Sequence, residues 1–394
     1  MRNPDRFRGS PAGKVVEVTN EGIGPSPYHA SVPSPLPPRL AITTRLARAL
    51  SSADRAIGEL SGLGRLLPNP YLLAHPFIRR EAVSSSRIEG TQADVGDVFA
   101  YEAGLFPSKI GVGSSDVREV HNYVRALEHG VKTVKELPVC VRLMRDLHRI
   151  LMEGVRGQDL GPGELRSRQN WIGRPSCTVY EADYTPPPPT EMNACLRDLE
   201  RFINEGDDLP PLLRVGLVHA QFEEIHPFLD GNGRIGRLLI SLLMIDWRLL
   251  PSPLLYLSDY FERNRDAYYS LLLAVSERGA WDEWLEFFLE GVATQARAAV
   301  VRAKRLEDLR AGFRDALQGV RGSVSGPRLA DSLFETPFVT VRAAAKLLDA
   351  SDQTARLAVE RLVDVGILTP GARTRQGVLY VCQSVLAAIS DAER

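Results

Sequence analysis

The sequence has few cysteines, almost no net charge and no long apolar run. Its four cysteines are scattered over 394 residues and form no C-x-x-C pair, so we expect neither a disulfide framework nor a structural zinc site. A formal net charge of −1 gives no general attraction to nucleic acid or anionic membranes. The longest apolar stretch, residues 238–250, is too short to cross a bilayer. Since no apolar signal segment is visible at the N-terminus, the sequence predicts a cytoplasmic protein with no membrane partner.

What is present is an ordinary globular composition with clear internal boundaries. A hydrophobic content of 44% in a chain of this length predicts two or three domains with real cores. Proline, glycine and the helical patterns divide the chain into five predicted segments. These are an extended Pro-rich arm (1–38), a helical N-terminal region (39–112), a helical core (113–290), a solvated connecting helix with a linker (291–325), and a C-terminal domain (326–394).

The core contains one stretch dense in chemistry, His226-Pro-Phe-Leu-Asp-Gly-Asn-Gly-Arg-Ile-Gly-Arg237. Apolar residues at helical spacing precede and follow it, so the stretch is predicted to be a loop that enters the N-terminus of a helix. Gly231 and Gly233 allow the backbone amides to converge without interference from Cβ atoms. Converging amides at the positive end of a helix dipole predict an anion site.

The charged side chains of this stretch would complete a phosphoryl-transfer site. Arg234 and Arg237 lie three residues apart on one helix face and can reach further phosphates. Asp230 beside phosphate oxygens indicates Mg²⁺, which favours one or two carboxylates with phosphate and water. His226 can take a proton from a hydroxyl group at neutral pH. A lone histidine is more often a buried structural residue, but the whole ordered set favours a site.

The stretch resembles the motif of the Fic family, H-x-F-x-[D/E]-G-N-G-R-x-x-R, at every specified position. The resemblance implies a mainly α Fic-fold helical bundle with a small β-hairpin flap. It also implies transfer of AMP from ATP to a Ser, Thr or Tyr hydroxyl of a protein, with 113–290 as the catalytic core. The implied roles are His226 as base, Asp230 as Mg²⁺ ligand, Asn232 with the loop amides at the α-phosphate, Arg234 and Arg237 at the outer phosphates, and Tyr268 or its neighbour Tyr269 at the nucleotide base.

A second stretch, Ser85-Ser-Arg-Ile-Glu-Gly90, ends a helix predicted over 76–90. Glu89 stands near the C-terminal end of this helix, where the dipole disfavours a carboxylate. Ser85, four residues earlier, shares its face. An exposed glutamate tolerated at small cost is one interpretation. The stretch also resembles the Fic inhibitory motif, [S/T]-x-x-x-E-[G/N], which implies that Glu89 pairs with Arg237 and crowds the position of the ATP γ-phosphate.

Two further regions carry predictions. Residues 166–189 contain short β-prone pieces and a proline run, which predict a hairpin resembling the Fic flap that holds a target by strand addition. Residues 341–381 predict a helix-turn-helix with a β wing, resembling the winged-helix domain attached to many Fic proteins. Charge in this domain is balanced. A basic face could still come from Arg356, Arg361, Arg373 and Arg375, so DNA binding and protein docking stay equally open.

Three functions are open at this point. The first is a protein adenylyltransferase with ATP and Mg²⁺ as cofactors, restrained by Glu89 and able to modify itself. The second uses the same site to remove AMP or to transfer another phosphate-containing group. The third is a DNA-binding regulator whose Fic core senses nucleotide. A homodimer is expected only by analogy with relatives, and neither the target protein nor its modified residue follows from the sequence.

Overall fold

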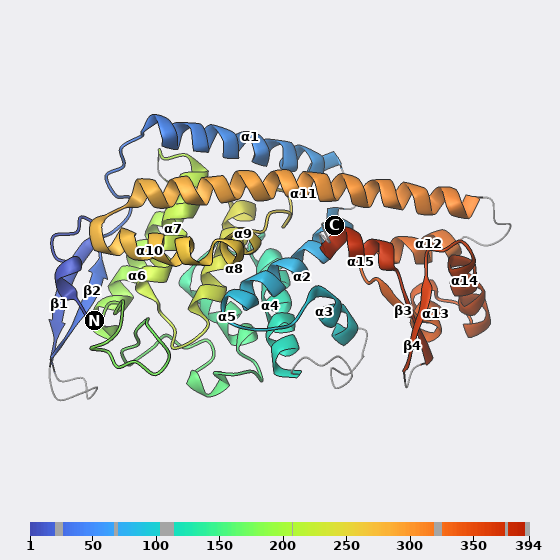
Figure 1. Ribbon diagram of the computed structural model, residues 1–394, viewed down its shortest axis with the longest axis horizontal. Helices are drawn as coiled ribbons and strands as arrows, with labels where there is room; N and C mark the ends of the chain where they lie inside the picture. Colours follow the sequence, from blue (N-terminus) through green and yellow to red (C-terminus); the bar gives the residue numbers. More distant parts are fainter. Residues whose placement is uncertain are drawn as a thin grey trace.

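The computed structural model describes residues 1–19, 27–66, 70–102, 114–206, 208–318, 325–374 and 377–390. Helices dominate it, and two small antiparallel sheets lie at opposite ends of the elongated molecule (Figure 1). One sheet pairs β1 with β2, and the other has the strand order β3-β5-β4. The mainly helical fold class predicted from the sequence is confirmed. No helix in these described ranges is both long and apolar enough to span a lipid bilayer.

The elements are bounded as follows. The helices are α1 (Thr44–Leu66), α2 (Pro70–Ile88), α3 (Val95–Glu102), α4 (Ser114–Thr133), α5 (Val141–Leu151), α6 (Pro189–Asn204), α7 (Pro211–Ile225), α8 (Asn232–Asp246), α9 (Ser258–Arg263), α10 (Arg265–Arg278), α11 (Trp281–Gln318), α12 (Ser325–Ser332), α13 (Val341–Leu348), α14 (Asp352–Asp364) and α15 (Gln383–Ser390). The strands are β1 (Gly13–Val18), β2 (Tyr28–Pro33), β3 (Phe338–Thr340), β4 (Thr369–Thr374) and β5 (Gly377–Val381).

The described residues of the predicted extended arm, 1–19 and 27–38, include two paired strands and contact the core. β1 pairs with β2 in an antiparallel hairpin, and the N–H of Ser31 in β2 donates to the carbonyl of Thr185 at 2.8 Å. Tyr28 packs against Val179 in a small apolar cluster. The alternating apolar residues of β2 thus find burial against the 166–189 segment, a contact that proline and glycine content could not reveal.

The 166–189 segment itself is only marginally a hairpin. The expected pair of strands is reduced to one antiparallel bridge between Ile172 and Tyr184. The bridge is held by the Ile172 N–H, which donates to the carbonyl of Tyr184 at 2.8 Å, and by the Asp183 N–H, which donates to the carbonyl of Ile172 at 2.9 Å. Proline at 186–189 cannot supply the donors that a longer ladder needs.

Helix α2 starts earlier than predicted, so Pro76 lies inside it and not in its first turn. Burial of Ala74, Phe77 and Ile78 around the proline stabilises the helix there. Gly90 follows the helix with a φ of 100°, as the sequence predicts. Three consecutive charged residues tie α2 to distant parts of the chain. Arg79 donates to Glu102, Arg80 donates to Asp259 and to the carbonyl of Ile389, and Glu81 accepts from Ser258 and Tyr123.

Helix α11 corrects the prediction of a solvated connecting helix over part of 291–325. It is one continuous helix of 38 residues that runs along α1 (Figure 1). Its buried stripe includes Ala296, Ala299 and Ala303, whose small side chains let the two helices approach closely. Ion pairs from Arg45 to Glu286 at 2.6 Å and from Glu59 to Lys304 at 3.7 Å show that α1 and α11 run in the same direction. Most of the charges that indicated solvation lie on the outer side of the helix, while Arg302 is buried.

The C-terminal region has the predicted order of helix, turn, helix and β-hairpin. Thr340 and Ser351 cap α13 and α14 by accepting backbone N–H groups with their hydroxyls. Asp349 takes a left-handed φ of 52° in the tight turn between these helices. The last helix, α15, packs on α2 and α11. The assignment of this region as a winged helix stays a prediction.

Helices α7 and α8 form the centre of the core. Almost every residue of α7 is buried, since α1, α6, α8, α10, α11 and β2 surround it. One of these buried residues is Glu224, with 4% of its surface exposed. Burial raises its pKa to about 8, although Ser276 Oγ donates a hydrogen bond of 2.6 Å to its carboxyl group. The surroundings therefore disfavour the ionised form of Glu224, whose hydrogen bond with Ser276 anchors α10 to α7.

This burial predicts a pH dependence of stability. The folded-state pKa lies above the ordinary value of 4.5, so the contribution of Glu224 is fully present below about pH 4.5 and is lost as pH rises through about 8. We expect Glu224→Gln to flatten the fall of the melting temperature between those limits. Thermal unfolding of both proteins across this range measures it, with exposed Glu290→Gln as control. Parallel curves for wild type and Glu224→Gln would contradict the assignment.

Candidate functional site

The predicted loop between two helices is present and is closed by two left-handed residues. His226 ends α7 with φ 48° and ψ 61°, and its N–H donates to the carbonyl of Phe222 at 3.0 Å. Gly231, with φ 78°, precedes α8. A Cβ atom at Gly231 would lie 3.1 Å from the sulfur of Met152, so glycine is required by both conformation and space. The first amides of α8 have no acceptor within the helix, which leaves them available to an anion.

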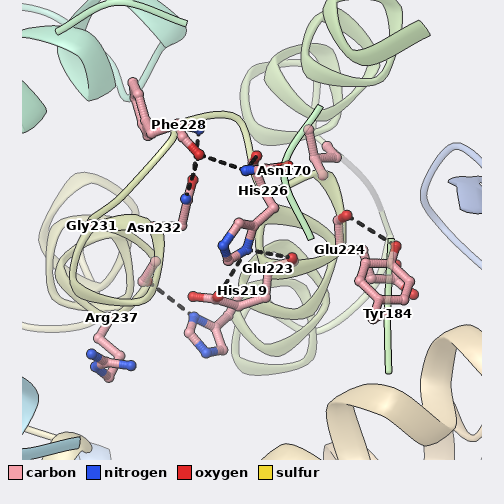
Figure 2. Close-up of polar contacts among 12 residues, drawn as sticks. Asn170, Tyr184, His219, Glu223, Glu224, His226, Phe228, Gly231, Asn232 and Arg237 are labelled. Atoms are coloured by element: carbon pink, nitrogen blue, oxygen red, sulfur yellow. Dashed lines mark hydrogen bonds and ion pairs between the residues drawn. The ribbon is translucent and has the colours of Figure 1, made fainter. Parts of the chain in front are cut away.

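Asn232 shapes this loop with its side chain. Its Oδ1 accepts the N–H of Phe228 at 2.8 Å, and its Nδ2 donates to the carbonyl of Phe228 at 2.8 Å (Figure 2). Only 2% of the residue is exposed. The sequence assigns this amide to a phosphate, but in the structure both of its ends are used inside the loop. Asn232 therefore acts as a brace for the loop, and its backbone N–H is the group left for an anion.

His148, which the sequence gives no functional role, supports the loop from α5. Its Nδ1 accepts the N–H of Gly163 at 2.8 Å, so Nε2 carries the proton and donates to the carbonyl of Asp230 at 3.0 Å. Its ring stacks on Phe228 with centroids 3.9 Å apart. Burial lowers the pKa of His148 to about 4, which keeps this bridge neutral at pH 7. In the sequence His148 is only a polar residue within a helical pattern, so no signal distinguished it.

The 166–189 segment contributes two further residues. Arg166 Nε donates to the carbonyl of His226 at 2.9 Å. Asn170 Nδ2 donates to the carbonyls of His226 and Phe228 at 3.2 and 2.7 Å (Figure 2). Donors from outside the loop thus satisfy the carbonyls that its left-handed turn leaves outside the helix. The conformation of His226 depends on this segment.

His226 is held as a neutral base. Burial and, after it, the charge of Arg166 lower the pKa of its imidazole to about 4. Its Nδ1 faces the carbonyl of Glu223 at 3.3 Å and a carboxylate oxygen of the same residue at 4.0 Å. Since both neighbours of Nδ1 are acceptors, the proton belongs on Nδ1 and the lone pair on Nε2. Nε2 can then remove a proton from a hydroxyl group.

Arg234 and Arg237 are both buried in the core at the start of α8, with 1% and 2% exposed. Arg234 lies 3.3 Å from Glu119 of α4 and 3.6 Å from Asp230. Glu119, another residue without a sequence prediction, thus compensates the charge of Arg234. Two buried guanidinium groups beside open helix amides give the loop a strongly positive character.

Arg237 makes the salt bridge that the resemblance implies. Its Nη2 donates to Glu89 Oε1 at 2.6 Å and to the carbonyl of Ser85 at 3.0 Å, and its Nε donates to Ser85 Oγ at 2.9 Å. Burial alone would raise the pKa of Glu89, but the charge and hydrogen bond of Arg237 bring it below its ordinary value. A Cβ atom at Gly233 would collide with Glu89 Oε1, so this glycine permits the close approach of α2.

Asp230 fits the predicted Mg²⁺ ligand as far as its own chemistry goes. It accepts the N–H of Gly231 at 2.6 Å, and 35% of its side chain is exposed. Within the described part of the chain no three His, Cys, Asp or Glu side chains converge as a cluster for a metal ion. A single accessible carboxylate next to an anion site suits a cation that takes its other ligands from phosphate and water.

Tyr268 does not lie where a nucleotide could reach it. It is 1% exposed, and its hydroxyl is 2.9 Å from His219 Nε2 within a cluster of stacked rings. Its neighbour Tyr269 has 42% of its surface exposed and lies under the guanidinium of Arg265 at 5.7 Å. The helical phase of α10 turns the first tyrosine into the core and the second outward. Of the two tyrosines that the resemblance allows at the nucleotide base, only Tyr269 is exposed, and a contact of either with a nucleotide stays a prediction.

Two family models match the chain. Residues 47–132 match the Fic/DOC family N-terminal model, and residues 138–244 match the Fic/DOC family model. "Protein adenylyltransferase Fic" of Drosophila erecta is 27% identical over 154 residues, covering 37% of this chain and 29% of the relative. The protein of the same name from Drosophila melanogaster is 26% identical with the same coverage. The matched region thus spans less than a third of the length of these relatives.

Two solved structures are similar in fold. A Fic family protein from Desulfovibrio desulfuricans G20 has a TM-score of 0.58 at 21% identity, covering 88% of this chain and 98% of that one. A Fic domain containing signaling protein from Bacteroides thetaiotaomicron VPI-5482 has a TM-score of 0.51 at 21% identity, covering 64% and 96%. The first likeness extends well beyond the two matched family regions.

The role of Asn232 as a brace can be tested by stability. Asn232→Ala leaves the buried N–H of Phe228 without its acceptor, and we expect a loss on the order of 2 kcal/mol in the free energy of unfolding. Denaturant titration measures it. Asn264→Ala is the matched control, because Asn264 is exposed and its side chain donates a hydrogen bond to the carbonyl of Tyr260. Equal small losses for both variants would show that the brace is unimportant.

Proposed function

The chain belongs to the Fic/DOC family, and from this premise we propose that it is a protein adenylyltransferase. It would transfer AMP from ATP to a Ser, Thr or Tyr hydroxyl of a protein. The observation that carries the proposal is the neutral His226 close to the open start of α8 (Figure 2), a helix whose first turns hold the buried Arg234 and Arg237. The relatives named adenylyltransferases support it within the matched region.

The chemistry divides among the residues of the loop. His226 Nε2 takes the proton of the acceptor hydroxyl, whose oxygen attacks the α-phosphorus while the bond to pyrophosphate breaks. The amides and dipole of α8 stabilise charge on the α-phosphate oxygens, with Arg234 at the outer phosphates. Asp230 would hold Mg²⁺, which when bound neutralises charge on the phosphates. Fixed donors in a buried loop need little reorganisation during the reaction.

The contact between Glu89 and Arg237 supports autoinhibition as part of the proposal. Arg237 uses Nε and Nη2 on Ser85 and Glu89, so it is not free to bind a γ-phosphate. ATP can then enter only with its outer phosphates away from the geometry that in-line attack requires. A misplacement of about 1 Å can cost on the order of a hundredfold in rate.

The alternatives use the same residues in other ways. Removal of AMP from a modified protein would use Glu89 to place a water molecule, and the intact loop is compatible with that reaction. DNA binding by the C-terminal region would have to use a surface of mixed charge. The exposed side of α14 carries Arg356 and the apolar Leu357, but also Asp352, Glu360 and Asp364. Arg361 is half-buried in the same helix and Arg373 is exposed in β4, so the charge is mixed and protein docking stays an alternative to DNA binding.

The base is tested by His226→Ala. We expect transfer of α-labelled AMP to fall at least a hundredfold, with ATP binding within about twofold of wild type, because His226 faces the acceptor and not the phosphates. Labelled transfer and calorimetric binding are measured together. His129→Ala is the control, since His129 is an exposed residue of α4. Transfer at a near wild-type rate in His226→Ala would refute the mechanism.

Autoinhibition is tested by Glu89→Gly. Residue 89 lies in the turn after α2, so glycine there costs little helix stability. We expect AMP transfer, including self-modification seen by intact mass, to rise tenfold or more because Arg237 becomes available. Arg237→Ala in the Glu89→Gly background should cancel the gain. Glu136→Gly, at an exposed turn, is the matched control. An unchanged or reduced rate in Glu89→Gly would falsify the restraint.

A further inference from the structure

Glu223 lies beside Nδ1 of His226, and the proposed mechanism gives Glu223 no role. It stands in the last turn of α7, three residues before His226. Figure 2 joins the two residues by two dashed lines, one to the Glu223 carbonyl at 3.3 Å and one to carboxylate Oε2 at 4.0 Å. The side chain is 12% exposed. Both the backbone and the side chain of Glu223 therefore face the same ring nitrogen, Nδ1.

The other carboxylate oxygen has no partner. Oε1 of Glu223 is buried and accepts no hydrogen bond from any residue that the structure describes. Gly236 of α8 packs against it so closely that an added Cβ would collide with Oε1. A buried carboxyl group with an unused oxygen costs free energy, and such groups concentrate where function requires them. The surroundings of Glu223 do not explain it as a structural anchor.

Charged and titratable groups approach Glu223 from three other helices. Arg237 of α8 and Glu89, just after α2, act on its ionisation in opposite directions. Tyr268 of α10 feels its charge and is itself held neutral by burial. Burial raises the pKa of Glu223 to about 7, Arg237 opposes this rise and Glu89 adds to it. Near neutral pH the carboxyl group can therefore exist in either form.

We propose that Glu223 is the positioning residue of the base, orienting His226 through Nδ1 and stabilising the imidazolium that forms when Nε2 takes the proton of the acceptor. The expected effect on the rate rests on the proposed AMP transfer. The orientation of His226 by Glu223 does not depend on that function. The proton stays on His226 during attack, and the carboxylate of Glu223 supplies the compensating negative charge 4.0 Å away. No proton needs to reach Glu223 itself.

A residue that only fills space would behave differently. Replacing a space-filling carboxylic acid by its amide would change stability and would lower the rate equally at all pH values. A positioning carboxylate must be ionised to act, so the rate should rise with pH as Glu223 loses its proton. The ionisation of His226 adds no pH dependence of its own near neutral pH, because burial lowers its pKa to about 4.

The experiment uses the full chain in the Glu89→Gly background, where transfer is expected to be measurable. Transfer of α-labelled AMP is followed from about pH 5.5 to 9. We expect the parent rate to rise with pH and to level off near neutral pH, because the charge of Glu89 that helps to raise the pKa of Glu223 is absent. Glu223→Gln should lose this rise and at least tenfold of the plateau rate, with ATP binding within about twofold. Glu224→Gln is the matched control, because this neighbouring buried carboxyl bonds Ser276 and not His226. Glu224→Gln should keep the rise of the rate with pH.

A second readout separates this proposal from the proposed function. In ¹⁵N-histidine NMR, His226 should carry its proton on Nδ1 in the parent. In Glu223→Gln that preference should weaken at pH values above about 7, where the parent Glu223 is ionised. If the parent transfers no AMP, the proposed function fails, while the NMR titration still decides the role of Glu223. Two results would overturn the assignment. One is an unchanged His226 spectrum in Glu223→Gln. The other is a Glu223→Gln rate that still rises with pH and stays within about twofold of the parent.

Discussion

The constraint on which the site depends is that a helix start must stay open to an anion inside a closed apolar core. The N-terminal amides of α8 and the guanidinium groups of Arg234 and Arg237 are all positive in character. Burying them without compensation would be costly. The structure answers with carboxylates from separate helices, Glu119 for Arg234 and Glu89 for Arg237. Each acid holds a place that a phosphate oxygen could take.

If Glu89 restrains the site as proposed, this compensation makes inhibition a consequence of stability. An arginine that is ready for phosphate in the absence of phosphate needs another anion, and the nearest anion belongs to the protein itself. Glu89 is the better candidate for exchange, since 31% of its side chain is exposed while that of Glu119 is 4% exposed. Solvent and ligand can therefore displace Glu89 more easily, and Glu119 serves as a permanent partner of Arg234.

The segment that carries Glu89 is also joined to the rest of the molecule through buried polar contacts. Arg80 reaches the carbonyl of Ile389 in α15 at 2.9 Å, and Glu81 accepts from Ser258 and Tyr123. A displacement of α2 large enough to withdraw Glu89 would break such contacts, whereas a change in the turn after Ile88 would not. Release of the proposed restraint would therefore disturb fewer contacts through the turn than through a movement of α2.

Some features follow from the sequence because their causes are local. The loop from His226 to Arg237 lies between two apolar helices, and its glycines occupy positions that only glycine suits, as at Gly231. Spacing also identified the two arginines and the base. The failures have local causes too. Pro76 was read as a helix start because proline favours a first turn, but burial of the flanking residues extends α2 past it.

The sequence by itself determined that a histidine, a carboxylate and two arginines surround the start of a helix, because all of them lie within twelve residues of one chain. Only the tertiary structure decided how they are held. His148 meets the carbonyl of Asp230 across 82 residues, and Arg237 meets Glu89 across 148. It also turned Tyr268 inward and used the amide of Asn232 as a brace. Such partners are chosen by packing between helices, and packing depends on distances that no local pattern contains.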